Sequence, residues 1–258
     1  MSSHKFRTYI VCVLLLTSTF SKAQKTIVIS DSLASTAEKQ SVKMGGQGLG
    51  KIWKFHFGDY AVVSSKMGWT TSSTKGNFFN TKTENKSTQK FSFLMAGKGP
   101  DTANVNAARN IMVQSLNEIE LLPHFSWGSN EVKQSSDNFS AFITINGDTS
   151  EVWALLMNIT SGQNANGSYD AFLTNVERKI FLVPASSNKN GGDNHSSPAL
   201  GYEFIENGQS IGALQYYGGG MMGMNKNIVW IQKDLSDKMK LILASAMTAL
   251  LQIKAVPQ

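Results

Sequence analysis

The segment 241–251 constrains the fold of this chain most, because a helix of this sequence is apolar on every face. Ser236 carries an N-cap side chain, and the helical pattern that follows it runs to about Lys254. Within the segment only Ser245 and Thr248 are polar, and both are small. A helix of this kind must be surrounded by protein or lipid. A membrane span needs about 20 apolar residues, so we expect a buried core helix, with an amphipathic helix lying on a sheet as the alternative.

Most of the remaining chain shows strand patterns. Asn146-Gly147 and Asn207-Gly208 each separate two apolar runs, and both positions of the dipeptide tolerate positive φ, which predicts two β-hairpins. A further strand pair is expected within 171–183, and the polar stretch 70–90 is either a long loop or an edge hairpin. Further strands are expected at 26–29, 52–57, 60–63, 91–95 and 228–231.

The segment 101–122 carries a different pattern. Its apolar residues recur at three- and four-residue steps and Pro100 precedes it, which favours a second, amphipathic helix. Asparagines and β-branched residues within the segment weaken that pattern. The residues at these steps are Val105, Ala108, Met112, Leu116 and Ile119.

Together these patterns predict a strand-dominated α+β fold. An antiparallel sheet or barrel packs around or against the buried C-terminal helix. We expect a signal peptide at 1–23, an N-terminal arm with a glycine-rich loop at 24–50, and a single globular domain at 51–258.

The N-terminus has the three parts of a secretory signal. Two basic residues within the first seven precede an apolar run at 9–16, and small residues at Ser21 and Ala23 suit signal peptidase. The apolar run is too short for a transmembrane anchor. We therefore expect cleavage after Ala23, a secreted or periplasmic location, and no transmembrane span afterwards.

Cleavage changes what the chain can do. It removes Cys12, the only cysteine, so disulfides, thiolate metal sites and cysteine nucleophiles are excluded from the mature protein. Three basic residues leave as well, so 21 basic residues face 18 acidic ones and the net charge is near +3. Only Arg109 and Arg178 remain as arginines, and the lysines are scattered. We expect no nucleic-acid partner.

Two motifs resemble catalytic or nucleotide sites without fitting them. Residues 208–212 match the G-x-S-x-G nucleophile elbow around Ser210, but the pattern continues as a strand, and the last histidine, His195, precedes the serine. Residues 45–51 match a phosphate-binding loop, but Ile52 stands where a magnesium-binding hydroxyl is needed.

Metal and acid–base candidates are equally sparse. A thioether copper site at the loop Met221–Met224 has no nearby histidine. The three histidines of the mature chain lie far apart, and Asp101, Glu203 and Glu206 could meet only through the fold. We therefore assign no catalytic, cofactor-binding or metal residues and expect no cofactor. The histidines are His56, His124 and His195.

The C-terminal third resembles one known group. The strand order 202–205, the turn Asn207-Gly208, the strands 210–213 and 229–231, and the apolar helix 235–251 resemble the end of tubby-like proteins, including LURP-one and scramblase-like domains. The resemblance implies a closed antiparallel barrel around a hydrophobic C-terminal helix. It also implies a membrane-lipid ligand in some members, but no basic pocket that matches theirs is visible, so it carries no site residues.

Three classes of function follow. The lack of a catalytic set favours a non-catalytic envelope or extracellular binding module. A secreted hydrolase with a site assembled from distant residues would show convergent carboxylates or a Ser–His pair. A lipid- or membrane-associated tubby-like protein, with a lipid or envelope partner, would show an open apolar cavity beside the final helix, rimmed by lysines.

Overall fold

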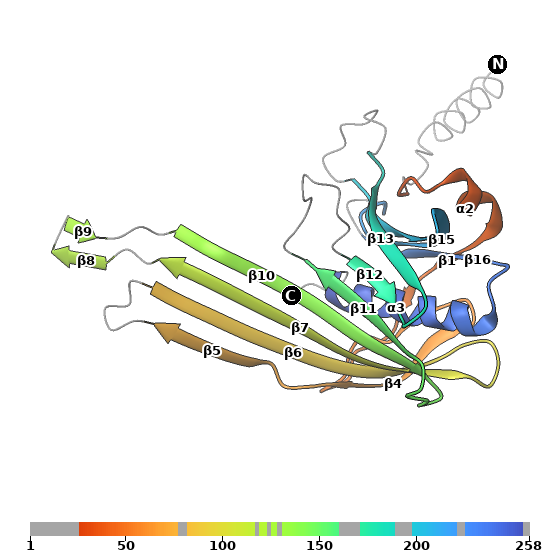
Figure 1. The fold of residues 1–258 in the computed structure, drawn as a ribbon, viewed down its shortest axis with the longest axis horizontal. Coiled ribbons are helices and arrows are strands. Elements are labelled where there is room, and N and C mark those ends of the chain that lie inside the picture. Colours follow the sequence, from red (N-terminus) through yellow and green to blue (C-terminus); the bar gives the residue numbers. More distant parts are fainter. Residues whose placement is uncertain are drawn as a thin grey trace, which may run out of the picture.

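The computed structural model describes residues 26–76, 82–116, 119–122, 125–127, 131–159, 171–188, 198–220 and 225–254. Within these residues, fourteen strands form one large antiparallel sheet that is nearly closed into a barrel (Figure 1). One long C-terminal helix accompanies the sheet. The strand-dominated α+β class is therefore confirmed.

The elements are α2 (Asp31–Thr36), β1 (Ala37–Ser41), β2 (Lys43–Met44), β3 (Phe55–Phe57), β4 (Tyr60–Met67), β5 (Thr71–Gly76), β6 (Lys82–Ala96), β7 (Thr102–Leu116), β8 (Ile119–Leu122), β9 (Phe125–Trp127), β10 (Glu131–Ile145), β11 (Val152–Asn158), β12 (Ala171–Thr174), β13 (Lys179–Ser186), β14 (Leu200–Glu206), β15 (Gln209–Tyr217), β16 (Ile228–Gln232) and α3 (Asp237–Lys254).

One extended segment connects the two ends of the sheet. The strand order is β1-β16-β15-β14-β13-β12-β11-β10-β7-β6-β4-β3-β2, with β5 pairing β6 outside this path. Only Val42 separates β1, at one end, from β2, at the other, and its N–H donates to the carbonyl of Asn227. Because β1 and β2 are consecutive in the N-terminal arm, they hold the two ends of the sheet next to each other, and the sheet is nearly closed into a barrel.

Both predicted Asn-Gly hairpins are confirmed. Asn146 and Gly147 connect β10 to β11 with φ of 52° and 75°, and Asn207 and Gly208 connect β14 to β15 with φ of 49° and 79°. Two successive positive φ angles match the twist of an antiparallel pair. The strand pair within 171–183 is confirmed as β12 and β13, and the stretch 70–90 contributes the pairing of β5 with β6.

The predicted helix at 101–122 is wrong. Residues 102–116 form the strand β7, which pairs with β6 on one side and with β10 on the other. Ala103, Val105 and Ala107 are buried and alternate with outward-facing asparagines, which is the period of a strand. The apparent helical steps combined residues from both faces, because Val105 points inward whereas Ala108 lies on the outer face.

Four strands extend beyond the barrel. β4 pairs with β6 only from Phe91 onward, and β11 pairs with β10 only from Asn138 onward. The residues 71–76, 82–88, 110–116 and 131–137 therefore form a projecting four-stranded sheet, here called the blade, with the β8–β9 hairpin at its tip (Figure 1). Where the structure describes side chains of the blade, none is fully buried.

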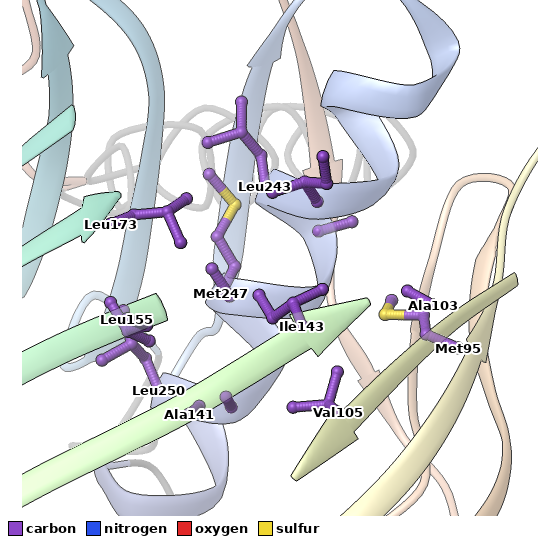
Figure 2. Close-up of a cluster of buried hydrophobic side chains, with 14 of the residues drawn as sticks. Met95, Ala103, Val105, Ala141, Ile143, Leu155, Leu173, Leu243, Met247 and Leu250 are labelled. Atoms are coloured by element: carbon purple, nitrogen blue, oxygen red, sulfur yellow. The ribbon is translucent and has the colours of Figure 1, made fainter. Parts of the chain in front are cut away.

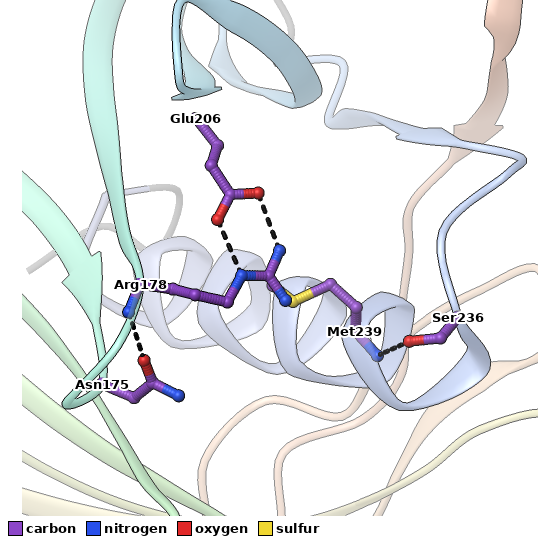
Figure 3. A network of polar contacts seen from close by, with 5 residues as sticks. All are labelled: Asn175, Arg178, Glu206, Ser236 and Met239. Atoms are coloured by element: carbon purple, nitrogen blue, oxygen red, sulfur yellow. Dashed lines mark hydrogen bonds and ion pairs between the residues drawn. The ribbon is translucent and has the colours of Figure 1, made fainter.

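From Leu241 to Leu251, every side chain of α3 is buried. Leu243, Met247 and Leu250 are 0% exposed and lie among side chains of β10, β11 and β12 (Figure 2). Ser245 and Thr248, its two small polar residues, are also 0% exposed, and the Thr248 hydroxyl donates to the Met95 sulfur at 3.5 Å. The N-cap prediction is confirmed, because the Met239 N–H donates to the Ser236 hydroxyl at 3.2 Å (Figure 3).

A second, smaller apolar cluster fixes the N-terminal arm. Leu33 of α2 is 0% exposed and packs with Ile27. Two buried polar side chains satisfy the arm's backbone: Gln215 accepts from the Ile27 N–H at 3.0 Å, and Glu203 accepts from the Ser30 N–H at 2.8 Å. The arm is therefore bound to the sheet through specific hydrogen bonds as well as apolar packing.

Candidate ligand-binding face

The outer face of β4, β6, β7, β10 and β11 carries the strongest candidate site. Side chains alternate along these strands, so the odd-numbered residues Val105, Ala107 and Ile143 enter the core. The even-numbered residues between them point outward. Asn106 and Phe142 are direct cross-strand neighbours in this outer face, and both are exposed.

A shallow hollow forms where the outer side chains are small. Ala108 and Ser140 are paired in register and give it a low floor. Phe142, 48% exposed, forms one wall, and Lys90 and Lys66 line it from β6 and β4. Its volume is ≈ 290 Å³. The hollow thus combines an aromatic ring, two ammonium groups and small polar side chains.

Two further hollows adjoin the first. One, of ≈ 270 Å³, shares Ser140 and is lined by Asn110, Asn138 and Asn158, which lie side by side on three neighbouring strands. The other, of ≈ 260 Å³, shares Lys66, Ser92 and Asn106 with the first hollow and adds Ser64, Ser65 and Asn104. The residues that line these three hollows are called the outer patch below.

Amide groups dominate the polar chemistry of the outer patch. Asn110 accepts a hydrogen bond from the Thr88 hydroxyl at 2.9 Å, which extends the row of asparagines onto β6. Each asparagine side chain offers donors and an acceptor. None of the three hollows is lined by a carboxylate. Such a surface can bind polar ligands.

The structure separates the acidic residues that the sequence left as candidates. Asp101 accepts from the Asn146 amide, and Glu203 is occupied by the backbone of the N-terminal arm. Glu206 forms a bidentate ion pair with Arg178, with both N–O distances 2.7 Å (Figure 3). The three carboxylates therefore serve structural contacts in different places and do not form one site.

The two discarded motifs also lie in ordinary structure. Ser210 is the second residue of β15, which continues as a strand, whereas a nucleophile elbow requires a helix to follow. Residues 45–51 connect β2 with β3, and no helix begins there.

Of the histidines and the methionine loop considered as metal ligands, the structure describes only His56. His56 is exposed on β3, with Phe55 and Phe57 buried on the other face. His124, His195 and the loop Met221–Met224 lie outside the described residues. In the residues that are described, no three histidine, cysteine or acidic side chains gather at metal-binding distance.

A cluster of titratable groups lies at the C-terminal end of α3. The Tyr202 and Tyr216 rings stack with centroids 5.6 Å apart, and the Lys254 ammonium lies 5.8 Å from the Tyr216 ring. Burial raises the pKa of both tyrosines and lowers the pKa of Lys254, which the nearby Asp137 partly restores. Asp137 itself is paired with Arg109 at 2.6 Å. None of these residues lines any of the three hollows.

Sequence reasoning missed the outer patch. The signal was present in Asn104, Asn106 and Asn110, which recur at even spacing and share one face only if the segment is a strand. A helix at 101–122 would place Asn104 on a different face from Asn106 and Asn110, so the helix prediction does not indicate a polar face shared by all three.

Comparison with protein-family models, with curated proteins and with solved structures gave no match for this chain. Among the described helices, none combines the length and hydropathy that a membrane span requires.

Proposed function

We propose that this protein is an exported, non-catalytic binding module whose outer patch binds an extended glycan. The observation that carries the proposal is the run of three adjoining hollows along one sheet face, lined by amides, hydroxyls and an exposed phenylalanine. Each hollow is shallow and near the lower limit of small-molecule pockets, about 300 Å³. A chain lying along the face fits this shape better than an enclosed small molecule.

The chemistry of the outer patch suits sugars. Sugar hydroxyls both donate and accept, as asparagine amides do. The face of an exposed aromatic ring such as Phe142 packs against the C–H side of a sugar ring. A peptide bound by strand addition would need a free sheet edge. The central strands of the outer patch, β6, β7 and β10, are each paired on both sides and offer no such edge.

Binding of purified mature protein to immobilised polysaccharides tests the proposal. Phe142→Ala is expected to weaken binding at least tenfold, because it removes the aromatic wall of the first hollow. Val152→Ala is the matched control, since Val152 is an exposed outer-face residue that lines none of the three hollows. Failure of every polysaccharide to bind, or equal binding by both variants and the wild type, would refute the proposal.

The proposal also includes a barrel packed around α3, the arrangement that the tubby-like resemblance implies. The burial of Leu243, Met247 and Leu250 supports it. A lipid role would draw support from an apolar cavity beside α3, whereas the hollow that reaches α3, at Asp237 and Lys240, is lined mainly by charged side chains. Native mass spectrometry of protein from its own source, together with its N-terminal residue, tests lipid retention and export: cleavage after Ala23 leaves Gln24 first.

A further inference from the structure

We infer that the glycan bound by the outer patch is acidic, with its carboxylate or sulfate groups held by Lys66 and Lys90. This inference rests on the proposed function, because it names the ligand class of the same face. It goes beyond that proposal in assigning the charge of the ligand and the two residues that recognise it.

The two lysines lie together on the outer face. Lys66 of β4 is paired with Ser92 of β6, and the Gly68 N–H donates to the Lys90 carbonyl at 2.8 Å. Lys66 and Lys90 are therefore diagonal neighbours across two adjacent strands, a relation that brings long side chains within reach of each other. Both are exposed and both line the hollow next to Phe142.

The charge of this pair is not compensated within the described residues. The ammonium group of neither lysine takes part in an ion pair or hydrogen bond found there. Other charged side chains behave differently: Lys86 contacts Glu84, and Lys238 contacts Glu151. Two neighbouring cations without a counter-ion repel each other, and an anionic group placed between them removes that repulsion.

The number of basic residues indicates the kind of anion. Nucleic acids and anionic membranes are generally bound by stripes or clusters of four or more basic side chains. Here two lysines stand among asparagines and serines, with Phe142 beside them. That composition fits a polymer with widely spaced charges and many hydroxyl groups, which describes an acidic polysaccharide.

The experiment measures the affinity of the mature protein for matched acidic and neutral polysaccharides. The acidic set is polygalacturonate, alginate, hyaluronate and chondroitin sulfate. The neutral set is methyl-esterified polygalacturonate and dextran. At least one acidic polymer is expected to bind tenfold or more tightly than its neutral counterparts at low salt, with affinity falling as sodium chloride is raised.

Charge variants assign the effect to the lysine pair. The double variant Lys66→Gln/Lys90→Gln is expected to lose at least tenfold affinity for the acidic polymer and to retain its weak neutral binding. The control Lys98→Gln/Lys233→Gln makes the same change in net charge at exposed lysines that line none of the three hollows of the outer patch, and should bind like the wild type.

The outcomes separate the two proposals. If Phe142→Ala abolishes binding while the lysine variant does not and neutral polymers bind equally well, the inference fails and glycan binding stands. If no polysaccharide binds, the proposed function fails as well. Lysine-dependent binding to DNA or to phosphatidylglycerol vesicles, with none to polysaccharides, would overturn the ligand class for both.

Discussion

At the scale of single residues, the buried polar side chains hold segments that are distant in the sequence. Gln215 is 0% exposed and makes three contacts: it accepts from the Ile27 N–H and donates to the carbonyls of Gly218 and Lys226. Its side chain therefore connects the N-terminal arm with the segment that precedes β16. Removing the amide would take away the hydrogen bond of the Ile27 N–H, whereas the Gly218 carbonyl would keep the one from the Lys226 N–H.

We expect Gln215→Ala to lower the free energy of unfolding by about 2–4 kcal/mol, because it removes the partner of the buried Ile27 N–H and opens a cavity. Urea unfolding followed by tryptophan fluorescence measures the change. Gln209→Ala, at an exposed position on the same strand, should change stability by less than about 0.5 kcal/mol. Equal effects of the two variants would show that the Gln215 contacts are not important.

Glu151 gives the fold a defined dependence on pH. Its carboxylate binds the Lys238 ammonium and accepts from the Trp153 indole N–H at 2.9 Å, and these contacts, Lys238 first, lower the pKa of Glu151. A carboxyl whose folded pKa is lowered stabilises the protein above its unfolded pKa, about 4.3 for Glu. This stabilisation is lost as pH falls through the lower folded pKa.

Glu151→Gln should therefore reduce stability at pH 7 and reduce the slope of stability against pH below about 4.5. The effect is at most about 1 kcal/mol, because the Glu151 side chain is 38% exposed and screened by water. Urea midpoints of both proteins between pH 7 and 3 measure it. A constant difference between the two proteins over this range would contradict the assignment.

At the scale of elements, α3 differs from a surface helix because the small polar residues in its central part are buried. Ser245 is 0% exposed, and its hydroxyl has no hydrogen-bond partner within the described chain. Leu250, also 0% exposed, lies one turn further along among core side chains (Figure 2). The helix therefore responds to the loss of a methyl-bearing side chain very differently from the loss of a hydroxyl.

We expect Leu250→Ala to cost about 2–5 kcal/mol, the usual cost of a cavity at a core leucine. Ser245→Ala should be neutral or stabilising by up to about 1 kcal/mol, because it removes an unsatisfied buried hydroxyl. Thermal unfolding of both variants provides the comparison. A large loss of stability in Ser245→Ala would indicate a hydrogen bond to Ser245 that the described residues do not contain.

At the scale of the whole molecule, the blade and the barrel differ in how much apolar surface they bury. β7 runs through both: Ala103, Val105 and Ala107 lie in the buried core, whereas Ile111 and Val113 in the blade are only half-buried. A sheet without a covering layer has little apolar burial to resist local opening.

Hydrogen exchange should therefore be faster for the amides of 110–113 than for those of 103–107, although both groups belong to one strand. Exchange measured by mass spectrometry on peptides that divide β7 tests this expectation. Equal protection along the strand would mean that another molecule or a second copy covers the blade. Repeating the measurement over a range of protein concentrations distinguishes self-association from intrinsic stability.

Local chemistry was readable from the sequence. The Asn-Gly hairpins depend on the φ angles of two adjacent residues. The Ser236 cap depends on a hydrogen bond to a residue three positions away. The burial of α3 follows from the apolar residues on all of its faces. Each of these features is encoded within a few neighbouring residues. The prediction of a secretory signal ending at Ala23 has the same local basis and stays a prediction.

Tertiary structure decided the features that depend on distant partners. β7 is a strand because β6 and β10 supply hydrogen bonds on both sides, and those partners lie outside 102–116. The outer patch exists for the same reason: strand pairing places Lys66, Asn106 and Phe142 on one face although they are far apart in the chain. The sequence by itself determined the turns, the helix cap and the apolar helix, because each depends on neighbouring residues. The hydrogen bonds between strands join residues that are distant in the chain, so strand pairing in the tertiary structure decided the binding face.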